Sequence, residues 1–139
     1  MGNDISEFPA TVTIPVRWGD MDAFGHVNNT QYFRYFESAR IAYFEQMGIY
    51  GETLGGVGPI LARTSCRFRV PVTYPDTLTA GARVPDVGED RFTMEYAVWS
   101  ESSGTMVATG DGVIVSFDYA NGRKAPLPDS WKEMIAKLG

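Results

Sequence analysis

Apolar and polar residues alternate near the start of the chain. Every second position between residues 11 and 18 is apolar or aromatic, namely Val12, Ile14, Val16 and Trp18. A period of two is typical of a strand that buries one face, and Pro15 on the opposite face favours an edge strand or a bulge. The pattern predicts a half-buried strand that ends at Gly19.

A period of three to four residues replaces this alternation from Asn29 to Met47. The recurring positions are Tyr32, Phe33, Phe36, Ala39, Tyr43, Phe44 and Met47. Gly48 follows as a typical C-terminal stop, and the side chains of Asn28, Asn29 and Thr30 can accept hydrogen bonds from the first free amides of a helix. We predict one long helix with an aromatic buried face.

Strand patterns dominate the rest of the chain. The predicted strands cover residues 59–70, 77–87, 91–100 and 106–119, after a glycine-rich connection at Gly51, Gly55, Gly56 and Gly58. Turn signals at 74–76, 88–90 and 102–104 give the reversals of an antiparallel meander. Ser130 to Glu133 is a capping-box pattern that predicts a short C-terminal helix. This order predicts an α+β fold, with one helix laid across a five-stranded sheet.

Length and organisation favour a single domain. The 139 residues contain no internal repeat and no long Pro/Gly/Ser linker, so one domain over residues 1–139 is expected. One helix covers only one face of such a sheet. The second face and the free strand edges favour self-association, which predicts a homodimer or a homotetramer.

Charge and cysteine content exclude several classes of protein. Twelve basic against 17 acidic residues give a net charge of -5, which argues against nucleic acid and against an acidic membrane surface as partners. No apolar run approaches the ~18 residues needed to span a bilayer, so no membrane segment is expected. A single cysteine, Cys66, forms no internal disulfide, and a cytoplasmic location is expected. Its mid-strand position favours packing over nucleophilic catalysis.

His26 is the only histidine, which limits the chemistry further. One histidine and one distant cysteine do not give the ligand spacing of a zinc site. The glycine-rich signatures of phosphate loops and dinucleotide sites and the nucleophile elbow of serine hydrolases are also missing. We expect neither a metal nor a cofactor.

A polar stretch from Trp18 to Tyr32, WGDMDAFGHVNNTQY, separates the first predicted strand from the long helix. Free amides at a helix N-terminus can polarise a carbonyl oxygen, and Asp20 or Asp22 can act as general base or nucleophile. A thioester suits this equipment because its thiolate, with a pKa of about 8.5 if like cysteine, leaves without a strong acid. The same residues also fit a plain helix cap or Asx turn without catalysis.

This stretch resembles the opening motif of hotdog-fold thioesterases, which include the 4-hydroxybenzoyl-CoA thioesterases and related acyl-CoA and acyl-carrier-protein thioesterases. Further similarity lies in the segments Phe36-Glu37-x-x-Arg40, Phe68-Arg-Val-Pro71 and Pro75-Asp76-x-Leu78. The resemblance implies a five-stranded antiparallel sheet wrapped around one long helix. It also implies a thioester hydrolase that cleaves acyl-CoA to free acid and CoA.

The resemblance implies three catalytic positions. Asp22 matches the family carboxylate that serves as base or nucleophile, and Asn29 matches the position whose backbone N–H holds the thioester oxygen. His26 matches a histidine that takes part in catalysis in the acyl-carrier-protein thioesterases. That branch has Asn where this chain has Phe24, so the same use of His26 is left open.

Five substrate-binding residues are expected beside them. The resemblance assigns the turn glycine to Gly25, the His-Val-Asn-Asn motif to Asn28 and the following aromatic to Tyr32. Arg67 and Arg69 share a predicted strand face with Arg63 and can meet the phosphates of CoA, although a solvated sheet face explains them equally well. In this family the site resembles a cleft between protomers, so a second chain should complete it.

Two alternatives to hydrolysis stay open. On the same fold, a hydratase or dehydratase would use the carboxylate to move protons beside the thioester. A non-catalytic acyl-CoA-binding module would keep the cleft and turn nothing over. Hydrolysis alone releases a free thiol, and a binding module would tolerate loss of the Asp22 carboxylate.

Overall fold

The computed structural model describes residues 5–49 and 56–139. These described residues form two helices and six strands, with short 3-10 turns at Ile5–Glu7 and Trp18–Asp20. In chain order the elements are β1 (Ala10–Pro15), α1 (Asn29–Met47), β2 (Val57–Phe68), β3 (Thr77–Val87), β4 (Arg91–Ser100), β5 (Thr105–Asp118), β6 (Arg123–Lys124) and α2 (Asp129–Leu138). The predicted α+β class is confirmed.

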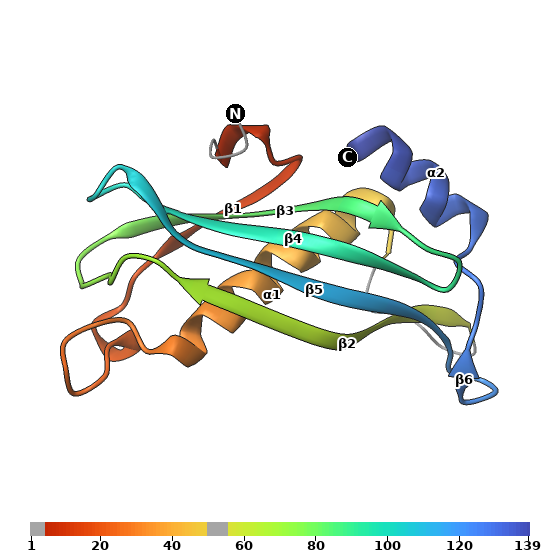
Figure 1. The fold of residues 1–139 in the computed structure, drawn as a ribbon, viewed down its shortest axis with the longest axis horizontal. Coiled ribbons are helices and arrows are strands. Elements are labelled where there is room, and N and C mark those ends of the chain that lie inside the picture. Colours follow the sequence, from red (N-terminus) through yellow and green to blue (C-terminus); the bar gives the residue numbers. More distant parts are fainter. Residues whose placement is uncertain (1–4, 50–55) are drawn as a thin grey trace.

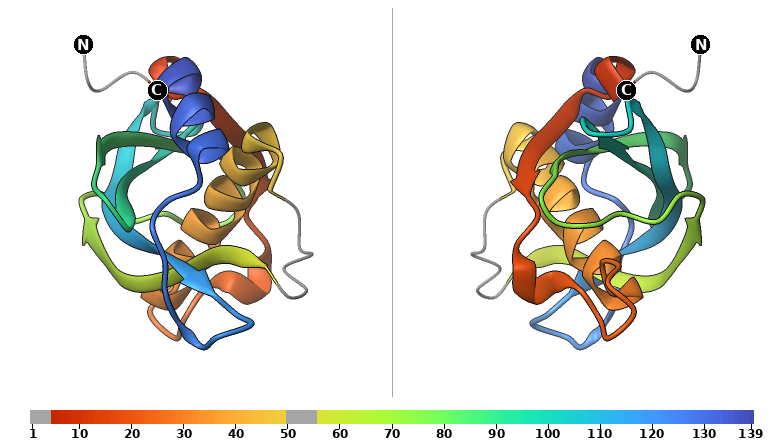
Figure 2. Two further views of the ribbon diagram at one scale, coloured as in Figure 1. Left: turned by 90° about the vertical axis from the view of Figure 1, so that its right-hand side faces the viewer. Right: turned by 90° about the vertical axis from the view of Figure 1, so that its left-hand side faces the viewer.

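All strands pair antiparallel in one sheet. The order is β1-β3-β4-β5-β2, with the two-residue β6 added beside β5. The sheet is strongly curled, and α1 runs along its concave side (Figures 1 and 2). The arrangement of a sheet around one long helix is thus present. The two ends of the sheet, β1 and β2, are edge strands, as expected for β1 from Pro15.

The core lies between α1 and the sheet. Phe36 stacks on Tyr96 of β4 with ring centroids 4.9 Å apart. One predicted core position of α1 is wrong: Phe33 is 38% exposed, whereas Tyr35 and Arg40 are buried. The buried guanidinium of Arg40 donates to the Tyr96 hydroxyl at 3.1 Å. The other predicted apolar positions of the helix are buried.

The first strand is shorter than predicted. It ends at Pro15, and Trp18 is 73% exposed in a 3-10 turn instead of lying on the strand's buried face. The cause is local, because the Asp20 carboxylate accepts the Arg17 N–H at 2.9 Å and folds the chain back before the strand can continue.

The C-terminal helix also differs from the prediction. α2 begins at Asp129 after Pro128, so Ser130 lies inside the first turn and the predicted capping box does not form.

The strand predicted to reach Val70 ends at Phe68, and the N–H groups of Arg69 and Val70 both donate to the carbonyl of Val107. Strand β6 was not predicted. Gly51 and Gly55 of the glycine-rich connection lie outside the described residues.

Candidate active site

The loop between β1 and α1 is a tight hairpin that holds Asp22 and His26 together. Met21 and Val27 form an isolated bridge, and the Asp22 N–H donates to the His26 carbonyl at 2.8 Å. The turn closes through the Gly25 N–H, which donates to the Asp22 carbonyl at 3.1 Å. Gly25 has φ +79°, a left-handed conformation that favours glycine. The expected turn glycine is therefore in place.

The Asp22 side chain is positioned by its own backbone. One carboxylate oxygen, Oδ1, accepts the Phe24 N–H at 2.9 Å in an Asx turn. The second oxygen has no partner among the described residues. The hairpin itself is anchored at both sides, through Val27 N–H to the Val72 carbonyl at 2.8 Å and Asn28 N–H to the Asp20 carbonyl at 2.9 Å.

The start of α1 leaves one amide open beside this carboxylate. Asn28 caps the helix, because its Oδ1 accepts the Thr30 N–H at 3.0 Å and its carbonyl accepts the Gln31 N–H at 2.9 Å. The Asn29 N–H has no acceptor in residues 5–49 and 56–139. It lies at the positive end of the helix dipole, where an oxygen ligand that gains negative charge is stabilised.

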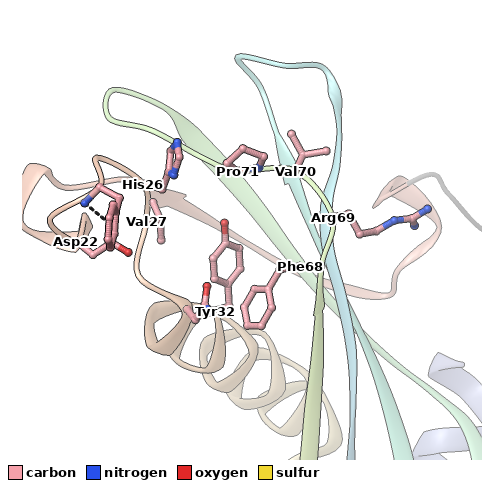
Figure 3. A pocket seen from close by; sticks show the side chains of 10 residues that line it. Asp22, His26, Val27, Tyr32, Phe68, Arg69, Val70 and Pro71 are labelled. Carbon is pink, nitrogen blue, oxygen red and sulfur yellow. Dashed lines mark hydrogen bonds between the residues drawn. The ribbon is translucent and has the colours of Figure 1, made fainter.

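These groups line one cavity of about 340 Å³. Of the residues predicted for the site, the structure brings together Asp22, His26, Asn29, Tyr32 and Arg69. Figure 3 shows Asp22 and His26 on the hairpin side, Tyr32 and Phe68 in the middle, and Arg69 on the far side with its side chain directed away from Asp22. The residues that sequence analysis did not assign are Phe24, Val27, Phe68, Val70 and Pro71.

Three of these unassigned residues lie in the segment Phe68-Arg-Val-Pro71, which the sequence had marked as similar to the family. Their exposure to a cavity follows from the early end of β2, which turns the chain toward the hairpin after Phe68. The sequence pattern predicted a continuous strand here, so it gave no reason to place them in a site.

Gly25, Asn28 and Arg67 do not line this cavity. Gly25 and Asn28 act through the backbone, one by closing the hairpin and the other by capping α1. Arg67 borders a separate hollow of about 440 Å³, together with Arg83 and Glu95, which form an ion pair at 2.6 Å.

The two candidate carboxylates are separated by the fold. Asp20 borders a different hollow, and its Oδ2 accepts the Arg17 N–H at 2.9 Å and the Tyr35 hydroxyl at 3.5 Å. Only Asp22 lies in the cavity with His26 and Asn29. Residue chemistry alone left the choice between Asp20 and Asp22 open, whereas the family resemblance assigned the role to Asp22, which is the carboxylate that lines this cavity.

Burial sets the protonation of two side chains nearby. It raises the pKa of Tyr32 to about 12, with further effects of Cys66 and Asp76 in the same direction, so the Tyr32 hydroxyl is neutral at ordinary pH. Burial also raises the pKa of the Cys66 thiol to about 11, which opposes its use as a thiolate nucleophile.

The described residues hold no group of three or more His, Cys, Asp or Glu side chains that is suited to a metal ion. Within the same part of the chain, no helix is both long and apolar enough to cross a bilayer. The lining of the cavity offers a carboxylate, an imidazole, a helix amide and a phenol.

The curled sheet around one helix is the hotdog fold, which solved thioesterases share. The chain belongs to the thioesterase-like superfamily, whose family model matches residues 16–135. A thioesterase from Thermus thermophilus, solved in complex with coenzyme A and Zn, is 34% identical with a TM-score of 0.83, and the match covers 95% of each chain.

Two other proteins extend this similarity. A putative thioesterase from Pseudomonas aeruginosa is 34% identical with a TM-score of 0.81, over 92% of this chain and 98% of that one. The chloroplastic acyl-acyl carrier protein thioesterase ATL3 of Arabidopsis thaliana is 26% identical over 119 residues, 84% of this chain and 62% of that protein.

Proposed function

We propose that the protein hydrolyses acyl-CoA thioesters to free acid and CoA in the cavity beside Asp22. One observation carries the proposal: Asp22 and Asn29 line the same cavity. Among the described residues, one carboxylate oxygen of Asp22 has no hydrogen-bond partner and the Asn29 N–H has no acceptor. Ester hydrolysis needs this pair, a group that activates or delivers an oxygen nucleophile and a donor for the oxygen that gains charge.

In the proposed reaction the thioester carbonyl oxygen accepts the Asn29 N–H. Asp22 then takes a proton from a water molecule while the water oxygen adds to the carbonyl carbon, the C–S bond breaks, and the thiolate takes up a proton. Alternatively, the Asp22 carboxylate adds directly and expels the thiolate, and water hydrolyses the resulting anhydride. Both routes consume one water molecule and give one acid and one thiol.

His26 completes the polar side of the cavity. It lies in the same hairpin as Asp22, whose N–H its carbonyl accepts, and its imidazole lines the cavity. We assign it to orienting the nucleophilic water or the ester. Because an orienting group contributes less than the group that activates the nucleophile, loss of the imidazole should lower turnover less than loss of the Asp22 carboxylate.

Coenzyme A as the leaving group is supported by the complex of the Thermus thermophilus relative with coenzyme A. We infer that Arg69, which lines this cavity, meets a phosphate of the arm, whereas Arg67 borders a separate hollow.

A second copy of the chain is part of the proposal. β2 is an edge strand of 12 residues that pairs with β5 on one side and with no described strand on the other. It exposes Val57, Ile60, Leu61 and Phe68. A long apolar edge favours pairing with another chain. Phe68 also borders the cavity, so a partner that covers this edge would help to enclose the substrate.

The test measures thiol release from short, long and aromatic acyl-CoAs, with products identified by mass. We expect release of CoA and free acid by the wild type, and a loss of at least ~100-fold in Asp22→Asn, the scale for a removed acid–base group. Equal rates for the two proteins would remove Asp22 from the mechanism.

The alternatives give other products in the same assay. A hydratase or dehydratase would change the mass of the acyl-CoA by one water without releasing thiol. A binding module would retain the ester unchanged and bind it equally well after the Asp22→Asn substitution. An acyl-carrier-protein thioesterase would favour esters of the carrier protein over CoA esters.

A further inference from the structure

Tyr32 differs from the other buried tyrosines. Tyr35 donates to Asp20, Tyr43 donates to the Gly139 carbonyl, and the Tyr96 hydroxyl accepts from Arg40. The Tyr32 side chain is equally buried, at 3% exposed, yet its hydroxyl has no hydrogen-bond partner among the described residues. Buried hydroxyls are nearly always paired, so an unpaired one requires an explanation.

The Tyr32 hydroxyl opens onto the cavity. Every fully enclosed side-chain nitrogen and oxygen of the described residues has a partner, so this unpaired hydroxyl must be in contact with open space. Figure 3 shows it pointing away from α1, between the hairpin that carries His26 and the segment at Val70 and Pro71. The Tyr32 ring makes edge-to-face contacts with the rings of Phe68 and Tyr35, with centroid distances of 5.2 Å and 5.6 Å.

The cavity that this hydroxyl faces has both apolar and polar lining. Phe68, Val27 and Val70 contribute apolar wall, and the polar residues Asp22, His26 and Asn29 make no hydrogen bond to the hydroxyl. Because the pKa of Tyr32 is about 12, the hydroxyl keeps its proton and can donate a hydrogen bond. An acyl group that enters the cavity displaces water from it. A hydrocarbon leaves the hydroxyl unpaired, whereas an oxygen restores the hydrogen bond, and sites built in this way reject analogues that lack the polar atom.

We propose that the Tyr32 hydroxyl makes the enzyme select acyl groups that carry an acceptor oxygen over hydrocarbon acyl groups of the same length. The proposal rests on the proposed function, since it places the acyl group in the cavity beside Asp22. Tyr32 is thereby a specificity-determining residue, and the oxygen that it recognises belongs to the acyl group and not to the thioester.

The experiment exchanges a single methylene for an ether oxygen. Methoxyacetyl-CoA is compared with butanoyl-CoA, 3-methoxypropanoyl-CoA with pentanoyl-CoA, and 4-methoxybutanoyl-CoA with hexanoyl-CoA, which moves the oxygen along the chain. The value of kcat/KM is measured for wild type, for Tyr32→Phe and for Tyr35→Phe. The Tyr35 variant is the matched control, because it loses a hydroxyl from the same helix that faces a different hollow.

For each pair, the quantity compared is the kcat/KM of the ether ester divided by the kcat/KM of the alkanoyl ester. For at least one pair we expect this ratio to be about tenfold or more higher in the wild type than in Tyr32→Phe. Comparing the two proteins cancels the different intrinsic reactivity of the esters. The control should keep the wild-type ratio. Equal ratios in wild type and Tyr32→Phe for all pairs would overturn the proposal. A uniform loss across all esters would also overturn it, because the hydroxyl would then act on the thioester or the CoA arm.

Binding measurements distinguish failure of this proposal from failure of the proposed hydrolysis. The same pairs are prepared as 2-oxoalkyl thioethers of CoA, which contain no thioester, and their Kd values are measured with wild type and Tyr32→Phe. A retained preference of the wild type for the ether analogues, without turnover of the esters, would support selection by Tyr32 and contradict hydrolysis. Absence of the preference, or of binding, contradicts selection.

Discussion

Asp20 and Asp22 show how far the backbone decides the role of a residue. They lie two positions apart and have the same chemistry, so only the family resemblance separated them in the sequence. The 3-10 turn uses the Asp20 carboxylate to hold Arg17 and Tyr35, whereas the hairpin closed by Gly25 turns Asp22 toward the cavity. Their difference is a matter of hydrogen bonding in two consecutive turns, which no spacing rule encodes.

Cys66 provides a prediction at the same scale. Its thiol pKa of about 11 leaves about one thiol in a thousand ionised at pH 8, against about one in four for a free cysteine with a pKa near 8.5. We expect slow reaction with a disulfide reagent in the folded protein, and a rate at least ~100-fold higher in denaturing urea. Since burial disfavours the thiolate in the folded protein, the folded state is favoured below pH 8.5 relative to higher pH, and this difference is lost as the pH rises through 11.

Activity gives an independent check on Cys66. Cys66→Ala should retain thiol release within a few fold, because the proposed mechanism does not use the thiol. Loss of more than ~100-fold in a folded Cys66→Ala protein would show that a cysteine nucleophile had been discounted in error.

At the scale of elements, hydrophobic periodicity predicted the bounds of those helices and strands that bury one face against the core. α1 and strands β3 and β4 have the predicted bounds, because a buried face repeats regularly along each of them. The prediction was less accurate where side chains compete for backbone amides, as in the capping box expected at Ser130. The cavity wall after β2 was missed for a related reason: the end of a strand depends on partners such as Val107, which are distant in sequence.

The contact between α1 and β5 yields a second prediction. A Cβ atom on Gly110 would collide with the Phe36 ring and with the Ser65 carbonyl, so the Phe36 ring packs against the β5 backbone only because this residue is glycine. Gly110→Ala should lower the free energy of unfolding by about 2–3 kcal/mol, the scale of overpacking in a core.

Urea denaturation of the variants tests this contact. Gly19→Ala is the matched control, because an added Cβ there meets nothing within 4 Å and its φ is not positive. The control should stay within about 0.5 kcal/mol of wild type. A Gly110→Ala protein as stable as the control would mean that α1 and β5 are not so tightly packed.

At the scale of the molecule, the free edge of β2 predicts the oligomeric state. Light scattering after size exclusion should give a homodimer or homotetramer for the wild type. Ile60→Lys places a charge on an edge residue that is 39% exposed and should shift the protein to smaller species with reduced turnover. Val87→Lys is the control, with 41% exposure at the end of β3. A wild-type monomer with full activity would contradict assembly through this edge.

The most direct test of the central claim compares two single substitutions that each remove one carboxylate. Asp22→Asn and Asp20→Asn are assayed for thiol release on the best acyl-CoA substrate, with folding checked by urea denaturation. The account predicts a loss of at least ~100-fold in kcat for Asp22→Asn and activity within a few fold of wild type for Asp20→Asn. Equal losses, or a larger loss for Asp20→Asn in a folded protein, would contradict a site built around Asp22.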